Sequence, residues 1–341
     1  MTYIFGIEST CDDTCAAVVR DGTEVLSNVV SSQDELHERF RGVVPEIASR
    51  AHLERIVPVM ERALEVSGLP LEGMDAVAVS NRPGLIGGLL VGLTTAKALS
   101  LLLELPLLAV DHVRAHVYAG MMAAPDWEPP AVALTASGGH TFLCLVRGPL
   151  DMRFLGRTID DAGGEAFDKG ANILGLRGGG PALDRLAREG NPRAFRFPRP
   201  MKDEGYDFSF SGLKTALLYK VYGPGSRMPA GGSPPPGAPL ADLAASYQEA
   251  ICDVFVLKTM RAAEEFGART VFVTGGVAAN SRLREKTAAR CAEAGVRAVF
   301  PPLSLCTDNA AMIAGLAMHH YLAGDFAPLD VQADARGEEE R

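Results

Sequence analysis

Two histidines at a helical spacing, His112 and His116, are the residues of this chain whose types most directly suggest chemistry. Side chains four positions apart on a helix lie on one face, about one turn apart. Two imidazoles in that arrangement can bind the same metal ion. An apolar run of strand-like length, residues 107–110, comes directly before the pair. The sequence therefore predicts the pair at the carboxyl end of a strand, where open α/β sheets bind their ligands.

Other interpretations of the pair stay open at this level. Two histidines on one helix face also occur as hydrogen-bonded polar residues at the rim of a core. A zinc protease with the H-E-x-x-H motif has a glutamate directly after the first histidine as its general base, and Val113 occupies that position here. Two histidines alone leave a first-row metal ion short of ligands, so a metal site requires a third ligand from elsewhere in the chain.

A turn of two glycines flanked by hydroxyl residues, S-G-G-H-T at residues 137–141, is a candidate anion-binding segment. Glycine lets backbone N–H groups approach an anion closely, and the serine and threonine hydroxyls are further donors. The alternative is an ordinary hairpin turn, in which glycine is common.

Three further polar residues lie in or beside glycine-containing segments and could bind a nucleotide. Asp168, in an acidic stretch, is either a carboxylate in a binding cleft or part of a solvated helix start. Asp184 follows a run of three glycines that permits close approach of a ribose, whose hydroxyls it can bind. Asn280 ends a glycine turn after a buried strand, where an α/β sheet places a nucleotide. It would pair with the edge of a base or cap the next helix.

Charge restricts the class of function. The 341 residues include 33 Lys and Arg against 42 Asp and Glu, a net charge of −9. This argues against a free-standing nucleic-acid-binding protein, whose surface is usually basic. A net negative charge is still compatible with a partner that binds nucleic acid, or with a local basic patch. The candidate patch consists of Arg39, Arg41, Arg50 and Arg55.

From the sequence we expect a cytoplasmic protein without a membrane association. Its first residues contain no basic start followed by a signal-like apolar segment. Its six cysteines include no C-x-x-C pair, which is typical of buried thiols in a reducing compartment. The apolar stretch 85–110 is interrupted by Lys97 and Glu104, so it predicts a buried helix and strand rather than a membrane span.

The elements predicted from apolar periodicity recur in the same order in both halves of the chain. The first half shows a hairpin at 3–19, a helix at 45–64, a strand at 75–79, a glycine turn at 82–88, a helix to 102, a strand at 107–110 and the histidine helix. The second half shows a hairpin at 131–146, a helix at 240–266, a strand at 270–273, a glycine turn at 275–280, a helix at 281–294, a strand at 296–300 and a helix at 308–322.

This duplication predicts an α/β fold of two RNase H-like lobes with a nucleotide and metal cleft between them, as in the actin-like ATPases. The predicted lobes are residues 1–130 and 131–325. The second contains an insertion, 150–239, with a flexible Gly/Pro loop at 223–239, and residues 326–341 are predicted to be disordered. Asp308 stands where the histidine pair stands in the first half, so it is the candidate third metal ligand, across the cleft. The alternative is that Asp308 caps the last helix.

Nine stretches match motifs of one known family. They are G-I-E-S-T-C-D-D-T at 6–14, G-V-V-P-E-I-A-S-R-A-H at 42–52, P-G-L-I-G-G-L-L-V-G at 83–92, H-V-R-A-H at 112–116, S-G-G-H-T at 137–141, D-D-A-G-G-E-A-F-D-K at 160–169, D-F-S-F-S-G-L-K-T-A at 207–216, G-G-V-A-A-N at 275–280 and T-D-N-A-A-M-I-A at 307–314. Over residues 3–323 the chain resembles bacterial tRNA N6-adenosine threonylcarbamoyltransferases, formerly described as O-sialoglycoprotein endopeptidases. It departs from the family in L-G-L-R-G-G-G-P at 174–181, one residue shorter than usual and without the aromatic residue.

The resemblance implies a set of site residues. Those matching the family's metal ligands are His112, His116 and Asp308, which hold one divalent ion, usually Fe(II) and sometimes zinc or magnesium. Those matching the phosphate- and acyl-binding turn are Thr135, Ala136, Ser137, Gly138 and Gly139. Those matching the residues that hold the adenine nucleotide, which is threonylcarbamoyl-AMP, AMP or ATP, are Asp168, Gly180, Asp184 and Asn280.

The resemblance also implies a reaction and partners. The family transfers threonylcarbamoyl from threonylcarbamoyl-AMP to N6 of adenosine 37 in tRNAs that read ANN codons, and it releases AMP. No covalent nucleophile is needed, and the sequence contains no G-x-S-x-G motif that would supply one. The partners implied are tRNA, a paralogous subunit without the catalytic motifs, and a small ATPase. The alternatives are an ATPase or sugar kinase of the same fold, a metalloprotease, for which the base is missing, and a non-catalytic scaffold.

Overall fold

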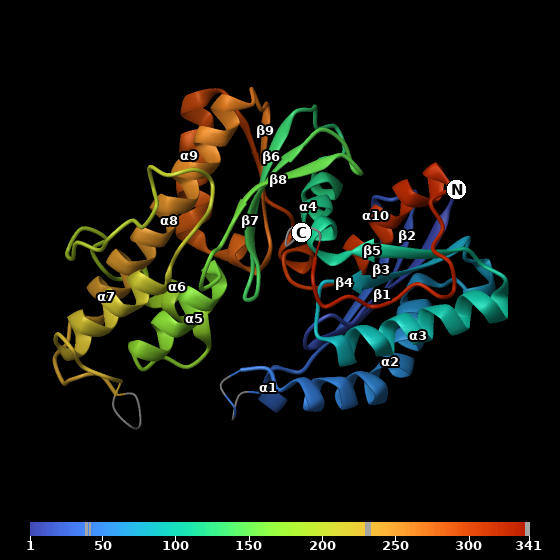
Figure 1. Cartoon of the computed structure of the whole chain (residues 1–341), viewed down its shortest axis with the longest axis horizontal. Coiled ribbons are helices and arrows are strands. Elements are labelled where there is room, and N and C mark those ends of the chain that lie inside the picture. Colours follow the sequence, from blue (N-terminus) through green and yellow to red (C-terminus); the bar gives the residue numbers. More distant parts are fainter. Residues whose placement is uncertain (38–39, 41, 229–232, 338–341) are drawn as a thin grey trace. The chain divides into compact units, whose positions relative to one another are not determined.

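A computed structural model describes residues 1–37, 40, 42–228 and 233–337 of the chain (Figure 1). The chain forms two compact units. The first consists of Met1–Pro125 together with Thr307–Arg341, and the second consists of Asp126–Cys306.

The first unit contains a five-stranded mixed sheet in the order β3-β2-β1-β4-β5. Its strands are β1 (Tyr3–Glu8), β2 (Asp13–Arg20), β3 (Glu24–Ser32), β4 (Ala76–Arg82) and β5 (Leu107–Asp111). The first three are antiparallel neighbours, whereas β4 and β5 run parallel to β1. The predicted hairpin, strands and glycine turn are confirmed, and β3 is an additional edge strand.

Helices cover both faces of this sheet (Figure 1). Helices α2 (Pro45–Ser67) and α3 (Ile86–Leu103) lie on one face, and α4 (His112–Ala123) and α10 (Ala310–Ala323) lie on the other. A short helix, α1 (Asp34–His37), and a 3₁₀ turn, Leu71–Gly73, complete the unit. Gly6 allows α10 to approach the sheet, because a Cβ there would lie 2.6 Å from the carbonyl oxygen of Ala310.

The second unit repeats the topology of the first, with the sheet order β10-β9-β6-β7-β8. Its strands are β6 (Ala131–Ala136), β7 (Thr141–Val146), β8 (Met152–Arg157), β9 (Thr270–Thr274) and β10 (Arg297–Val299). Three are antiparallel neighbours and two are parallel, in the same positions as in the first unit. The predicted duplication is therefore confirmed at the level of strand order.

The helices of the second unit are α5 (Gly163–Ile173), α6 (Gly179–Ala187), α7 (Ser211–Tyr222), α8 (Leu240–Glu265) and α9 (Ser281–Ala294), with 3₁₀ turns at Gly276–Ala279 and Leu303–Leu305. Helix α8 is the centre of its core, because it packs on β6, β9, α6 and α9. The predicted insertion thus contains β8, α5, α6 and α7. Part of the expected flexible loop at 223–239 lies outside the described residues.

The predicted division of the chain is wrong at its C-terminal end. Helix α10 was expected in the second lobe, but it packs on α4, β1 and β2 of the first unit, where residues 310–318 are all buried. The described tail is not disordered either. Ala327 N–H donates to the Leu107 carbonyl (2.8 Å), and Val331 packs on the core of the first unit. Apolar residues spaced among acidic ones therefore attach the tail to the sheet. Residues 338–341 lie outside the described residues.

Among the described residues, one helix, α3, is long and apolar enough to cross a membrane by length and composition. One face of α3, which includes Leu89, Leu93 and Ala96, is buried in the first unit. The sequence predicts a buried helix, but only 39% of α3 is buried, and Leu90, Leu101 and Leu102 are exposed.

Candidate metal and nucleotide sites

The start of α4 sets the direction of the histidine pair. Asp111 is the N-cap of the helix, and its Oδ1 accepts hydrogen bonds from the N–H groups of Val113 (3.0 Å) and Arg114 (3.1 Å). Such a cap contributes about 1 kcal/mol to helix stability. The guanidinium of Arg82 binds the other carboxylate oxygen (3.2 Å). This arrangement makes His112 the first residue of α4 and places His116 one turn further along the same face.

Asp308 joins the two histidines. Its Oδ1 lies 3.1 Å from Nε2 of His116 and 3.6 Å from Nε2 of His112, and the three potential ligand atoms lie within 4.8 Å of one another. The imidazoles are almost perpendicular, with ring centroids 4.6 Å apart. Both histidines are buried, whereas the Asp308 side chain is 21% exposed. All three residues belong to the first unit, so Asp308 does not come from the opposite unit as expected.

The alternative role of Asp308, capping the last helix, is excluded by its neighbour. Asn309 is the N-cap of α10, and its Oδ1 accepts a hydrogen bond from Met312 N–H (2.9 Å). The carboxylate of Asp308 is turned to His116 instead. The structure therefore assigns the cap and the candidate ligand to adjacent residues.

A buried carboxylate that the sequence analysis did not single out orients the first histidine. Oε2 of Glu8 lies 2.8 Å from Nδ1 of His112, and Oε1 accepts a hydrogen bond from Thr10 N–H (2.6 Å). Because a carboxylate accepts, Nδ1 of His112 donates, and this bond orients the ring so that Nε2 faces Asp308. Glu8 is the last residue of β1, and its signal in the sequence was its place in the motif G-I-E-S-T-C-D-D-T at residues 6–14.

The electrostatics of this cluster are those of a cation site. Burial opposes charge on His112, but the carboxylates of Glu8 and Asp308 together raise its pKa to about 9. Burial lowers the pKa of His116, and its Nδ1 has no hydrogen-bond partner among the described residues. Two imidazole nitrogens and one carboxylate oxygen form a donor set suited to iron or zinc. The residues present therefore fit a divalent transition metal ion.

The glycine turns of the second unit pack backbone to backbone. A Cβ on Gly164 would lie 2.4 Å from the Ser137 carbonyl oxygen, and a Cβ on Gly275, where φ is +81°, would lie 2.4 Å from that of Ala136. Ser137 N–H and the His140 carbonyl close the turn (2.8 Å). The structure thus brings together three segments, residues 135–140, 163–164 and 275, that the sequence presents far apart.

The residues of the predicted anion-binding turn differ in exposure. Gly138 and Gly139 have no atom within 4 Å of the position that a Cβ would occupy. Thr135 is fully buried, and its Oγ1 is 2.8 Å from Oγ1 of Thr274 on the adjacent strand. Thr135 therefore joins two strands beneath the turn, and the glycines form its open part.

The other predicted nucleotide residues form two groups around helix starts. Oδ1 of Asp168 accepts the N–H of Gly180 (2.7 Å) at the start of α6. Oδ1 of Asp184 accepts Ser281 Oγ–H (2.7 Å) at the start of α9. Oδ1 of Asn280 accepts Leu283 N–H (2.9 Å), so the predicted helix-capping role of Asn280 is confirmed. A role in binding a base would use its amide nitrogen.

Comparisons with known proteins identify the family of the chain. The chain matches the family described as tRNA N6-adenosine threonylcarbamoyltransferase over residues 24–315. It is 50% identical over 337 residues to the protein of that name from Moorella thermoacetica, covering 97% of this chain and 96% of the relative. It is 51% identical over 331 residues to the protein of that name from Symbiobacterium thermophilum, covering 97% and 95%.

Solved structures of other proteins share the fold. Component A of (R)-2-hydroxyglutaryl-CoA dehydratase from Acidaminococcus fermentans has a TM-score of 0.57 at 14% identity, covering 95% of this chain and 100% of that one. HypF from T. kodakarensis has a TM-score of 0.62 at 17% identity, covering 95% and 48%. These similarities support the actin-like α/β architecture alone. Family, relatives and duplicated topology agree, and the chain belongs to the tRNA N6-adenosine threonylcarbamoyltransferase family.

Proposed function

We propose that this protein transfers the threonylcarbamoyl group of threonylcarbamoyl-AMP to N6 of adenosine 37 in tRNAs that read ANN codons. The N6 amine forms a bond with the carbamoyl carbon and loses a proton. The bond between that carbon and the phosphate oxygen breaks, and AMP leaves. The observation that carries the proposal is the buried cluster of His112, His116 and Asp308, oriented by Glu8, in a member of this family.

We propose Fe(II) as the ion that these three residues hold, with zinc as an alternative. Magnesium is disfavoured by the donor set, because Mg²⁺ prefers oxygen ligands and two of the three ligand atoms here are imidazole nitrogens. When bound, the ion supplies a Lewis acid for the carbonyl or phosphate of the acyl-adenylate. Glu8 keeps the His112 ring in a fixed orientation, and Asp308 provides the negative charge that balances the ion.

The nucleotide part of the substrate is proposed to bind in the second unit. The residues are those expected from the sequence, Thr135, Ala136, Ser137, Gly138, Gly139, Asp168, Gly180, Asp184 and Asn280. The open backbone at Gly138 and Gly139 supports contact with a phosphate, because nothing lies where their side chains would be. Such backbone donors would also stabilise the charge that develops on the departing AMP.

We also propose that the protein acts in the cytoplasm with a paralogous subunit and a small ATPase. The net charge of −9 supports a need for help in holding tRNA. Exposed aliphatic side chains on two neighbouring helices, Leu53 and Val57 on α2 and Leu90 on α3, support a protein partner at that face. In the proposed basic patch, Arg50 and Arg55 are described, whereas Arg39 and Arg41 lie outside the described residues.

A transfer assay tests this function. Purified protein, its partners, threonylcarbamoyl-AMP and unmodified tRNA are incubated with and without a chelator, and threonylcarbamoyladenosine is measured after nuclease digestion. We expect product that is lost with the chelator and with His112→Ala. The exposed Arg62→Gln on α2 is the control, because it leaves the metal cluster intact. No product from the metal-loaded protein with active partners would contradict the transferase and favour the kinase or scaffold alternatives.

A further inference from the structure

One segment of the second unit is strongly basic in a protein that is acidic as a whole. Residues 177–202 contain seven Lys or Arg and two Asp or Glu, a net charge of +5, although the whole chain carries −9. This basic segment includes the turn before α6, α6 itself and the first part of the loop that leads to α7. Its exposed arginines are Arg177, Arg185, Arg188, Arg193 and Arg196. The excess of positive charge is therefore local and lies on the surface.

Four arginines of the basic segment are not neutralised by the protein. Those that form no ion pair with any described residue are Arg177, Arg185, Arg193 and Arg196. By contrast, two exposed arginines elsewhere in the same unit, Arg269 and Arg290, are paired with Glu128 and Glu293. An unpaired exposed arginine keeps its full charge for an anion that comes from outside the chain.

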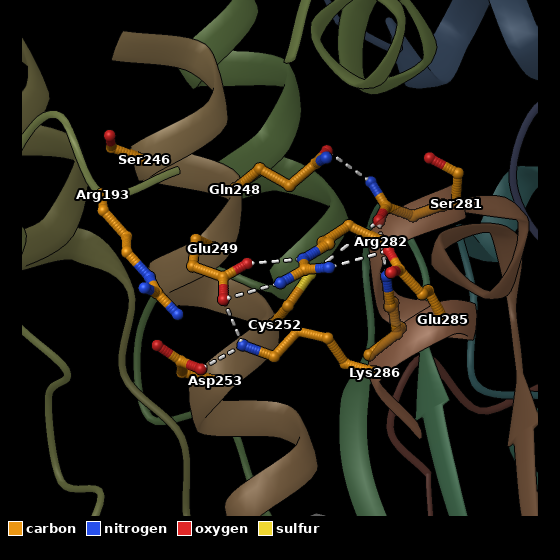
Figure 2. Close-up of polar contacts among 12 residues, drawn as sticks. Arg193, Ser246, Gln248, Glu249, Cys252, Asp253, Ser281, Arg282, Glu285 and Lys286 are labelled. Carbon is orange, nitrogen blue, oxygen red and sulfur yellow. Dashed lines mark hydrogen bonds and ion pairs between the residues drawn. The ribbon is translucent and has the colours of Figure 1, made fainter. Parts of the chain in front are cut away.

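The carboxylates of the neighbouring part of α8 are already occupied by other cations. Figure 2 shows Arg282 and Lys286 of α9 bound to Glu249, and Lys286 bound also to Asp253. Arg193, which is drawn in the same view, has no dashed contact. These carboxylates therefore neutralise the cations of α9 rather than those of the basic segment.

The backbone that carries two of the four arginines is held in place on α8. Oδ1 of Asp242 accepts the N–H of Asn191 (2.7 Å), and Oγ of Ser246 accepts the N–H of Phe195 (3.1 Å). The side chain of Phe197 is buried in the core of the unit. The arginines at 193 and 196 therefore project from a fixed loop, which lowers the conformational entropy that binding costs.

The other two arginines lie at α6, the helix that carries two of the proposed nucleotide residues, Gly180 and Asp184. Nη2 of Arg185 lies 3.9 Å from the position that a Cβ on Gly178 would occupy, so its guanidinium is turned back toward the turn that contains Arg177. A polyanion bound to these arginines would therefore lie next to the proposed nucleotide site.

We propose that the basic segment binds the sugar–phosphate backbone of the tRNA substrate through these four arginines. The proposal rests on the transferase function proposed above. A guanidinium can form two parallel hydrogen bonds with a phosphate, and an RNA presents one negative charge per nucleotide along its chain. Exposed arginines spread over a helix and a loop suit such an extended polyanion better than a single phosphate. Contacts of this kind position the RNA without reading its bases.

The test measures tRNA binding and its salt dependence in the full chain assembled with its partner subunits. Two double variants, Arg177→Gln with Arg185→Gln and Arg193→Gln with Arg196→Gln, are compared with wild type at about 50 to 200 mM salt. One phosphate contact contributes about 0.7–0.9 to the slope of log K against log[salt], which is about 5- to 8-fold in affinity at 0.1 M salt. We expect each double variant to bind tRNA about 25- to 60-fold more weakly at 0.1 M salt, with a slope smaller by about 1.5–2.

Arg269→Gln with Arg290→Gln is the matched control. It makes the same change of charge with exposed arginines of the same unit, outside the basic segment, and should leave tRNA affinity and slope unchanged. In the transfer assay the two test variants should raise KM for tRNA and leave kcat unchanged, because they remove binding that ground state and transition state share. A general structural defect would lower kcat as well, and thermal unfolding reports whether the variants are folded.

A tRNA that does not read ANN codons should lose the same factor in the test variants, because the contacts are to the backbone. Wild-type affinity and slope in both test variants, or an equal loss in the control, would overturn the proposal. Loss of the partner subunit with unchanged tRNA affinity would overturn it in favour of an acidic protein surface. The expected losses in an assembly that makes no threonylcarbamoyladenosine would support the RNA-binding surface and overturn the transferase function, whereas a wild-type assembly that binds no tRNA would overturn both.

Discussion

The substitution Glu8→Gln removes the carboxylate that orients His112 but keeps the size of the side chain. In the structure this carboxylate is fully buried, lies 2.8 Å from Nδ1 of His112, and accepts Thr10 N–H through its other oxygen. Glutamine can keep one accepting oxygen, but it loses the charge that strengthens the bond to His112. A charge-assisted hydrogen bond contributes about 1.5–3 kcal/mol, and loss of such a partner typically weakens metal binding by about 10- to 100-fold. We therefore expect the dissociation constant for Zn²⁺ or Fe²⁺ to rise by that factor.

Competition with a chromophoric chelator measures this constant directly, without reference to activity. Glu61→Gln is the matched control, because Glu61 is an exposed residue of α2 and should leave metal affinity unchanged. Glu8→Ala should weaken binding further, because it removes both acceptors and leaves Thr10 N–H without one. Equal metal affinity in Glu8→Gln and wild type, with both folded, would refute the argument that this hydrogen bond orients the ligand.

Four further substitutions test stability, which denaturant unfolding measures, and one of them also tests metal binding, which chelator competition measures. Asn309→Ala removes the cap of α10 and should cost about 1 kcal/mol, whereas Asp308→Asn should abolish metal binding with a smaller loss of stability in the metal-free protein. Gly275→Ala should cost about 1–3 kcal/mol, because φ is +81° and the new Cβ would lie 2.4 Å from the Ala136 carbonyl oxygen. Burial lowers the pKa of His52 below its usual 6.5, although the Cys11 carbonyl opposes this. The unfolded chain then binds a proton first, so stability should fall as the pH drops through about 6.5, and His52→Gln should reduce that slope. A steeper acid loss in His52→Gln than in wild type would contradict this.

The sequence was sufficient to predict the type and approximate ends of the elements that are buried on both faces. Strands such as β4 and β9 are continuous apolar runs bounded by polar or glycine turns, so their type and approximate ends could be predicted. The edge strands β3 and β8 were missed, because they are partly exposed and their residues are mixed. Pairing with β2 and β7 makes them strands, and such pairing is not encoded in local periodicity.

The position of α10 could not be predicted for a related reason. The order of elements suggested that each half of the chain builds its own unit, yet α10 follows the second sheet in sequence and packs on the first. Its burial pattern shows that it is apolar almost all round, with residues 310–318 buried. The composition of such a helix does not determine which of the two sheets it covers. The close fit at Gly6, where a side chain would collide with Ala310, shows which sheet is shaped to receive it.

The packing of α10 on the first unit also determines which residue can serve as the third ligand of the metal cluster. The spacing of His112 and His116 predicted the pair, but the third ligand depended on whether Asp308 faces the pair or caps its own helix. Both roles suit an aspartate at a helix start, and only the neighbouring residue separates them. Oδ1 of Asn309 accepts the hydrogen bond of Met312 N–H and thereby caps the helix, and Oδ1 of Asp308 lies 3.1 Å from Nε2 of His116. Because the cap and the candidate ligand are separate side chains, Asn309→Ala should mainly lower stability, whereas Asp308→Asn should mainly lower metal affinity.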